Sequence, residues 1–207
     1  MQYFPNNNNY TLKEFTSEYT STIKNVFDNL KDEDMEPIFD ALANSILSKK
    51  TIYTCGNGGS ASIAEHLVCD FIKGASTDSV VDPKVIPLLT TPVITAIGND
   101  IGYEEIFAYQ VEKYALSGDV LLSVSSSGDS PNIIRAIEIA NEKGLLTLSF
   151  VGFSGGKAKE ISDFSLHINS NNYGVVEDAH HILMHIFAQY LRMRNIDDNA
   201  KLGHVKF

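Results

Sequence analysis

The chain has 207 residues, which is enough for one α/β domain with a sizeable core. Hydrophobic residues make up 43% and charged residues 20%, both ordinary values for a globular protein. A net charge of −10 without a cluster of Lys and Arg argues against nucleic acid as a partner. No apolar run approaches the roughly 20 residues of a membrane span, so no membrane contact is expected. Two cysteines and a start unlike a signal peptide make the cytoplasm the expected location.

The N-terminal quarter predicts an arm and two helices. Residues 1–10 are polar and asparagine-rich, and we expect them to form a flexible arm. Apolar residues at helical spacing predict one helix over 10–30, starting near Thr11, and a second over 32–50. The apolar stripes of these two helices could pack on the domain or on another subunit.

A strand, a glycine turn and a helix follow between 51 and 73. The β-branched and aromatic residues 52–54 predict the end of a buried strand. Glycines in the turn allow positive φ and a close approach of a ligand, and Ser60 is a good N-cap for a helix over 61–73. Such a junction aims backbone N–H groups at one point and suits a phosphate, although an ordinary glycine turn is the alternative. The turn consists of Gly56, Asn57, Gly58 and Gly59.

Strands and helices alternate in the remainder of the chain. Residues 93–97 predict a helical turn or a short apolar segment, followed by a loop that carries Asp100. This alternation predicts the α/β class, with a doubly wound parallel sheet covered on both faces. We expect a single domain with an arm over 1–10, N-terminal helices over 11–50 and an α/β core over 51–194. Further strands are expected over 85–89, 119–124, 145–153 and 164–168, and helices over 104–115, 133–143, 156–161 and 175–193.

A second polar turn follows the strand over 119–124. Ser130 with Pro131 behind it is typical of a helix start. Ligands of parallel sheets bind at the carboxyl ends of the strands, where both polar turns lie. Two such turns at strand-to-helix junctions therefore favour a phosphorylated ligand over an incidental glycine turn. The hydroxyls of the second turn belong to Ser125, Ser126, Ser127 and Ser130.

Histidines and carboxylates recur every four residues on two of the predicted helices. His66 and Asp70 share one face of the central helix. Glu177, His181 and His185 share part of the surface of the last helix. If the two helices cross near the strand ends, these residues other than His181 could converge. Two histidines and two carboxylates would suit zinc or a similar divalent ion, and would equally suit proton transfer at a sugar carbon without metal.

Four segments carry these motifs in order: CGNGGSASIAEH, GNDIGYEE, GDVLLSVSSSGDSPNIIRAI and EDAHHILMH. They resemble the sugar-isomerase (SIS) family, and most closely its phosphoheptose isomerase branch, over roughly residues 11–194. The resemblance implies a flavodoxin-like sandwich and a cytoplasmic homotetramer with sites at subunit interfaces. It also implies a sugar-phosphate substrate, sedoheptulose 7-phosphate, converted to D-glycero-D-manno-heptose 7-phosphate.

The resemblance also implies roles for individual residues. Asp70 and His185 become the acid/base pair that moves a proton between neighbouring carbons through a cis-enediol. With the glycine turn included, the residues expected to bind the substrate or its phosphate are Asn57, Gly58, Gly59, Ser60, Asp100, Ser125, Ser126, Ser127, Ser130 and Glu177. The residues implied as ligands of zinc or another divalent metal are His66, Asp70, Glu177 and His185.

Five positions depart from the family pattern. Asp70 replaces a glutamate, and its side chain reaches about 1.5 Å less far. Glu177 replaces a glutamine, and its charge would tighten a divalent cation or raise the pKa of a neighbour. Lys73-Gly74 replaces a Gly-Arg pair, and Asp129 stands where asparagine is common. These changes concern the choice of substrate more than the class of reaction.

Three alternatives stand beside this interpretation. One SIS branch binds the bacterial replication initiator without catalysis and lacks the last-helix histidine, whereas His185 is present here. The second alternative is a regulatory phosphosugar-binding protein, and the third is an isomerase for another sugar phosphate.

Overall fold

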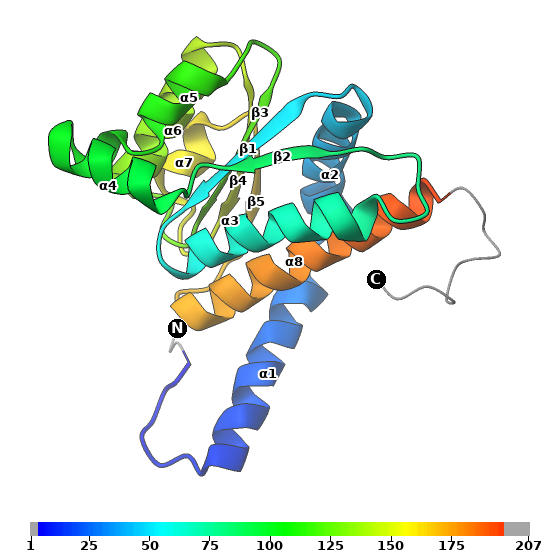
Figure 1. The fold of residues 1–207 in the computed structure, drawn as a ribbon. Helices are drawn as coiled ribbons and strands as arrows, with labels where there is room; N and C mark the ends of the chain where they lie inside the picture. The colour runs from blue at the N-terminus through cyan, green and yellow to red at the C-terminus, as the bar shows by residue number, and fades with distance from the viewer. Residues whose placement is uncertain (1–3, 197–207) are drawn as a thin grey trace.

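Five parallel strands form the centre of the molecule, in the order β2-β1-β3-β4-β5. The computed structural model describes residues 4–196 (Figure 1). All six residues of β3 are buried, as expected for the middle strand of a sheet covered on both faces. The strands are β1 (Thr51–Gly56), β2 (Lys84–Pro87), β3 (Val120–Ser125), β4 (Leu146–Val151) and β5 (Phe164–His167).

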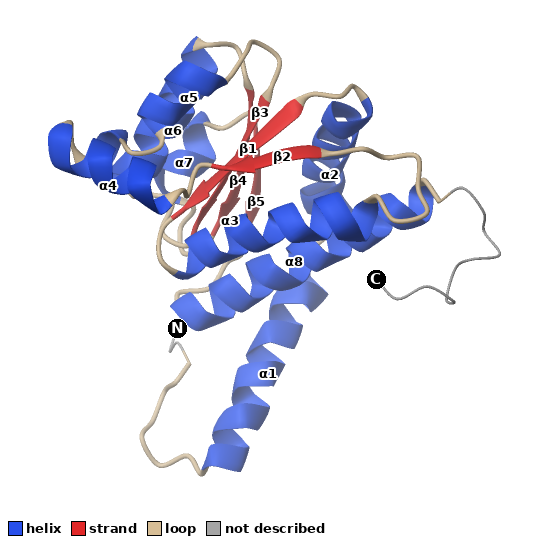
Figure 2. Cartoon of the chain, viewed as in Figure 1, coloured by secondary structure: helices blue, strands red, loops and turns tan. Residues whose placement is uncertain are grey.

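Helices cover both faces of the sheet (Figure 2). One face packs against α2 and α3, with α8 beside α3, and the other against α6 and α7, with α5 beside α6. This arrangement confirms the predicted doubly wound α/β sandwich. The α-helices are α1 (Leu12–Asn29), α2 (Asp32–Leu47), α3 (Gly59–Cys69), α4 (Thr91–Asp100), α5 (Ala108–Tyr114), α6 (Pro131–Glu142), α7 (Gly156–Ile161) and α8 (Tyr173–Arg194).

Two predicted helices differ in detail from the structure. The helix expected over 61–73 changes at its end into a π-helical segment, η1 (Asp70–Ala75). The helix expected over 104–115 is divided into a 3₁₀ turn, η2 (Tyr103–Glu105), and α5. Residues 93–97 belong to α4, which has Pro92 in its first turn, so that Asp100 ends a helix and does not lie in a loop.

The first helix projects from the body of the molecule (Figure 1). It begins with Thr11 as N-cap, as predicted, and none of its residues is buried. Tyr19 donates a hydrogen bond to Asp178 Oδ2 at 2.7 Å, which joins α1 to α8. Residues 4–10 of the predicted arm also make contacts, because the Phe4 ring packs on Phe15 and the Phe4 carbonyl accepts from Asn172 at 3.1 Å.

Between residues 4 and 196, no helix combines the length and apolar character that crossing a bilayer requires.

Candidate active site

The switch in strand order lies between β1 and β3, and it brings the two predicted ligand turns side by side. Gly56 at the end of β1 pairs with Val124 of β3. Crossover connections leave opposite faces of the sheet at such a point, which opens a crevice at the carboxyl ends of the strands. The turns after β1 and β3, and the helices that they start, therefore lie at the edge where ligands of such sheets bind.

An amide pair joins the two turns. The Asn57 side-chain amide donates to Asn132 Oδ1 at 2.8 Å, and the Asn132 amide donates to Asn57 Oδ1 at 2.9 Å. The Tyr103 hydroxyl donates to the same Asn57 oxygen at 3.1 Å. These three residues line a cavity of about 310 Å³ together with Glu104, Ser130 and Pro131. Asn57 and Ser130 are among the substrate-binding residues predicted from the sequence. Tyr103 and Asn132 are not, although both lie within the four motif segments.

The serine turn after β3 holds its hydroxyls in different ways. Ser125 Oγ accepts from the Gly128 N–H at 3.1 Å, and Ser127 Oγ accepts from the Asp129 N–H at 3.2 Å. Ser126 is buried, and its hydroxyl has no hydrogen-bond partner among the described residues. Helix α6 begins at Pro131 as predicted, but the Ser130 hydroxyl does not cap it. A buried hydroxyl without a partner is costly, so Ser126 Oγ has hydrogen-bonding capacity left for a ligand or a water molecule.

The glycine turn after β1 is occupied by a carboxylate from α8. A Cβ atom on Gly59 would lie 2.2 Å from Glu177 Oε2, so only glycine allows this approach. Glu177 therefore lies at the first turn of α3, where a negative charge is favourable. Burial, with Asp178 as a second cause, raises the pKa of Glu177. Ser60 is buried in the same turn.

A carboxylate and two imidazoles meet where α3 gives way to η1. Asp70 is buried, and its Oδ2 is hydrogen-bonded to His185 Nδ1 of α8. Asp70 Oδ1 lies 3.3 Å from His66 Nε2. The π-helical segment begins at Asp70 itself, and such segments are frequent at functional sites. The structure thus brings together three of the four residues implied as metal ligands, while Glu177 lies apart at the start of α3.

His181 joins this group although the implied set of ligands left it out. Its ring lies 5.1 Å from those of His66 and His185, measured between centroids. Burial, followed by the proximity of His185 and His66, lowers the pKa of His181, which favours the neutral imidazole. The only earlier signal for His181 was its four-residue spacing from Glu177 and His185.

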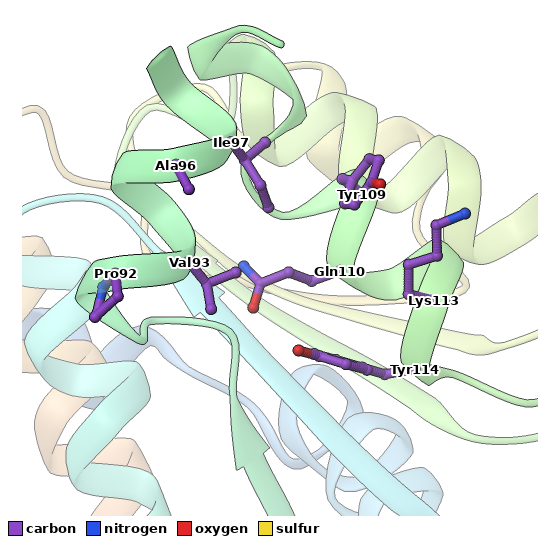
Figure 3. Close-up of a pocket in the computed structure, with 8 residues that line it drawn as sticks. All are labelled: Pro92, Val93, Ala96, Ile97, Tyr109, Gln110, Lys113 and Tyr114. Atoms are coloured by element: carbon purple, nitrogen blue, oxygen red, sulfur yellow. The ribbon is translucent and has the colours of Figure 1, made fainter. Parts of the chain in front are cut away.

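Two other features lie apart from this group. Asp100 is exposed at the end of α4, where Asn99 donates to its Oδ1 at 2.7 Å. A second cavity, of about 380 Å³, lies between α4 and α5, whose side chains face one another across it (Figure 3). Its walls are mostly apolar, and the amide of the buried Gln110 donates to the carbonyls of Leu88 and Ile106. None of the predicted site residues lines it.

The strand order and the paired turns define the class of flavodoxin-like α/β proteins. A family model described as SIS domain matches residues 14–152. A phosphoheptose isomerase of Aliarcobacter butzleri is 33% identical over 180 residues, which cover 87% of this chain and 94% of the relative. The phosphoheptose isomerase of Clostridium acetobutylicum is 36% identical over 154 residues, which cover 74% of this chain and 79% of the relative. The solved phosphoheptose isomerase GmhA of Neisseria gonorrhoeae has a TM-score of 0.79 at 26% identity, covering 87% of this chain and 98% of its own.

The chain therefore belongs to the SIS domain family, in its phosphoheptose isomerase branch. This assignment confirms the resemblance drawn from the four sequence segments.

His180 differs from its neighbours on α8 because it is fully buried. Its Nε2 lies 3.2 Å from the Val151 carbonyl, which can only accept, so Nε2 carries the proton. Nδ1 has no partner in the described part of the chain. Burial is the main cause that lowers the pKa of His180 to about 4. This buried histidine is therefore neutral in the folded protein at neutral pH.

Acidification is expected to weaken the fold through His180. The unfolded chain takes up this proton near pH 6.5, but the folded protein does so only near pH 4. In that window the unfolded state binds more protons, so the free energy of unfolding falls as the pH falls, by about 3 kcal/mol in total. Urea unfolding of the wild type and of His180→Asn between pH 7.5 and pH 4 measures this effect. An equally steep decline in the variant would show that His180 is not its source.

Proposed function

We propose that the protein is an aldose–ketose isomerase that converts sedoheptulose 7-phosphate to D-glycero-D-manno-heptose 7-phosphate in heptose biosynthesis. The observation that carries this proposal is the buried Asp70 carboxylate bonded to His185, in the same fold as a serine turn with an unpartnered hydroxyl. The relatives named phosphoheptose isomerase support the choice of reaction.

Binding would be the task of the two turns. The ester phosphate would lie in the serine turn at the N-terminus of α6, where Ser125, Ser126, Ser127 and Ser130 supply hydroxyls. Asn57 and the Gly58–Ser60 segment would contact the sugar, with Asp100 and Glu177 as further contacts. Because Glu177 already lies at the start of α3, the α6 turn is the better site for the phosphate dianion.

The reaction needs one proton to move between two carbons. Asp70 would take a proton from the hydroxymethyl carbon beside the ketone while the ketone oxygen becomes protonated, which gives the cis-enediol. Return of a proton to the second carbon, with loss of the proton from the first hydroxyl, then gives the aldehyde. His185 would share its proton with Asp70 and thereby act as its acid/base partner.

A divalent metal ion such as zinc fits the donors at this place, since three imidazoles and one carboxylate face one another. When bound, such an ion would polarise the carbonyl and hydroxyl oxygens of the substrate. The ligands that the family resemblance implies are His66, Asp70, Glu177 and His185.

We also propose a cytoplasmic homotetramer with sites at subunit interfaces. Helix α1 has no buried residue in the single chain, although it carries an apolar stripe. Ile182, Ile186 and Tyr190 repeat every four residues on an exposed face of α8. Surfaces of this kind are typical of protein–protein contacts, and α8 also carries His181 and His185.

Turnover with sedoheptulose 7-phosphate tests the proposed reaction. We expect NMR to show formation of the aldose phosphate, and no change of fructose 6-phosphate under the same conditions. Thermal stabilisation by the heptulose phosphate without turnover would reject the enzyme and favour a phosphosugar-binding protein. Turnover of fructose 6-phosphate alone would keep the reaction class and reject the substrate.

A further inference from the structure

We propose that the metal site of this protein consists of three imidazoles, those of His66, His181 and His185, with Asp70 as the carboxylate that orients His66 and His185. Glu177 is then not a ligand. The site takes a divalent ion that prefers nitrogen ligands, such as zinc or cobalt. This assignment rests on the proposed function, because it names the residues that would bind the metal ion in the proposed isomerase site.

Three nitrogen donors already lie close together. One ligand atom from each of His66, His181 and His185 can be chosen so that all lie within 4.8 Å of one another. Two nitrogens bound to one zinc ion, each at about 2.0–2.1 Å in tetrahedral geometry, lie roughly 3.4 Å apart. Small rotations of partly exposed side chains close this difference. His181 and His185 come from successive turns of α8, and their rings are stacked with an interplanar angle of 25°.

Asp70 is in the position of an orienting carboxylate. Its Oδ2 is hydrogen-bonded to Nδ1 of His185, which leaves Nε2 of that ring for a metal ion. Its other oxygen lies 3.3 Å from His66 Nε2, so a single buried carboxylate faces two of the three imidazoles. A carboxylate that accepts from a ligating histidine fixes the orientation of the ring and raises its basicity.

Glu177 lies near the other end of α3 from the three imidazoles. Its carboxylate lies against Gly59 in the first turn of α3. Gly59 precedes His66 by seven residues, or about 10 Å along the helix at 1.5 Å per residue. His181, one turn further along α8, faces His66 instead. Three histidine ligands leave a fourth position open, as in catalytic zinc sites.

Metal titration without any sugar tests this assignment. The metal-free full-length chain is titrated with Co²⁺, monitored by visible absorption, and then with Zn²⁺ against a chromophoric chelator. We expect one ion per chain and an affinity about 100-fold lower or worse in His181→Ala, more than the 10- to 100-fold that loss of an orienting residue such as Asp70 costs. Glu177→Gln is expected to keep the wild-type affinity. His167→Ala is the matched control, since its imidazole lies at the end of β5 and contacts Lys159 and Phe153.

Two results would overturn the assignment. One is a loss of affinity in Glu177→Gln with unchanged affinity in His181→Ala, which would restore the family's set of ligands. The other is the absence of stoichiometric binding by the wild type. Near-UV circular dichroism of each variant separates loss of a ligand from loss of the fold. The titration contains no substrate, so its outcome is independent of the turnover assay. Metal binding as expected without turnover of the heptulose phosphate rejects the proposed reaction alone. Turnover without metal binding as expected rejects the metal site alone.

Discussion

Replacing His185 by alanine is expected to remove turnover of sedoheptulose 7-phosphate while binding of the phosphate ester persists. His185 is bonded to Asp70 and shares in the proposed proton transfer, and such a residue contributes about 10²- to 10⁴-fold to the rate. The serine turn that would hold the phosphate belongs to β3 and α6 and contains no residue of α8. Binding measured by calorimetry should therefore remain close to that of the wild type.

His167→Ala serves as the matched control for this variant. It removes an imidazole of the same size from the end of β5, where no substrate contact is proposed. Its turnover should equal that of the wild type. If His185→Ala lost binding as strongly as turnover, the proposed division between a binding turn and an acid/base pair would be wrong.

Replacing Gly128, the glycine of the serine turn, by alanine is expected to lower the stability of the fold strongly. Gly128 has a φ of +70°, and a Cβ atom there would lie 1.9 Å from the carbonyl oxygen of Gly155. The obstructing atom belongs to the backbone of the turn after β4, so no side chain can move aside. Overpacking and backbone strain each cost about 1–3 kcal/mol, and together we expect about 2–6 kcal/mol.

Urea unfolding measures this loss, with Gly98→Ala as control. Gly98 lies inside α4, and a Cβ atom there would meet only Ile106 Cγ2, at an ordinary 3.8 Å. In a helix interior, alanine is better than glycine by up to about 1 kcal/mol. The control should therefore be neutral or slightly more stable. Equal effects in the two variants would show that the contact between the two turns is not tight.

Local signals in the sequence were sufficient for most of the fold. The pair Ser130-Pro131 marks the start of α6 because a proline at the first helical position needs no partner for its missing N–H. Alternating apolar strands and helices predicted the parallel sheet because only such a sheet buries strands on both faces. These signals depend on neighbours in the chain, and they hold wherever the tertiary structure agrees with them.

The site was predictable only in part, because its geometry depends on how α3 crosses α8. Four-residue spacing placed Glu177, His181 and His185 on one side of a helix, but it could not tell which of them faces His66. The change from α to π geometry at Asp70 likewise involves hydrogen bonds that no local sequence motif predicts. The pairing of Asn57 with Asn132 spans 75 residues and has no signature in either segment.

The bond between Asp70 and His185 also sets the point in the synthesis of the chain at which the proposed acid/base pair can form. It joins residues 115 positions apart, and His185 lies on the last helix that the structure describes. The amide pair between the two turns, by contrast, needs only Asn57 and Asn132. This amide pair can thus form earlier in synthesis than the proposed acid/base pair. The proposed acid/base pair is therefore the last part of the candidate site to be assembled, and a chain that stops before α8 lacks it.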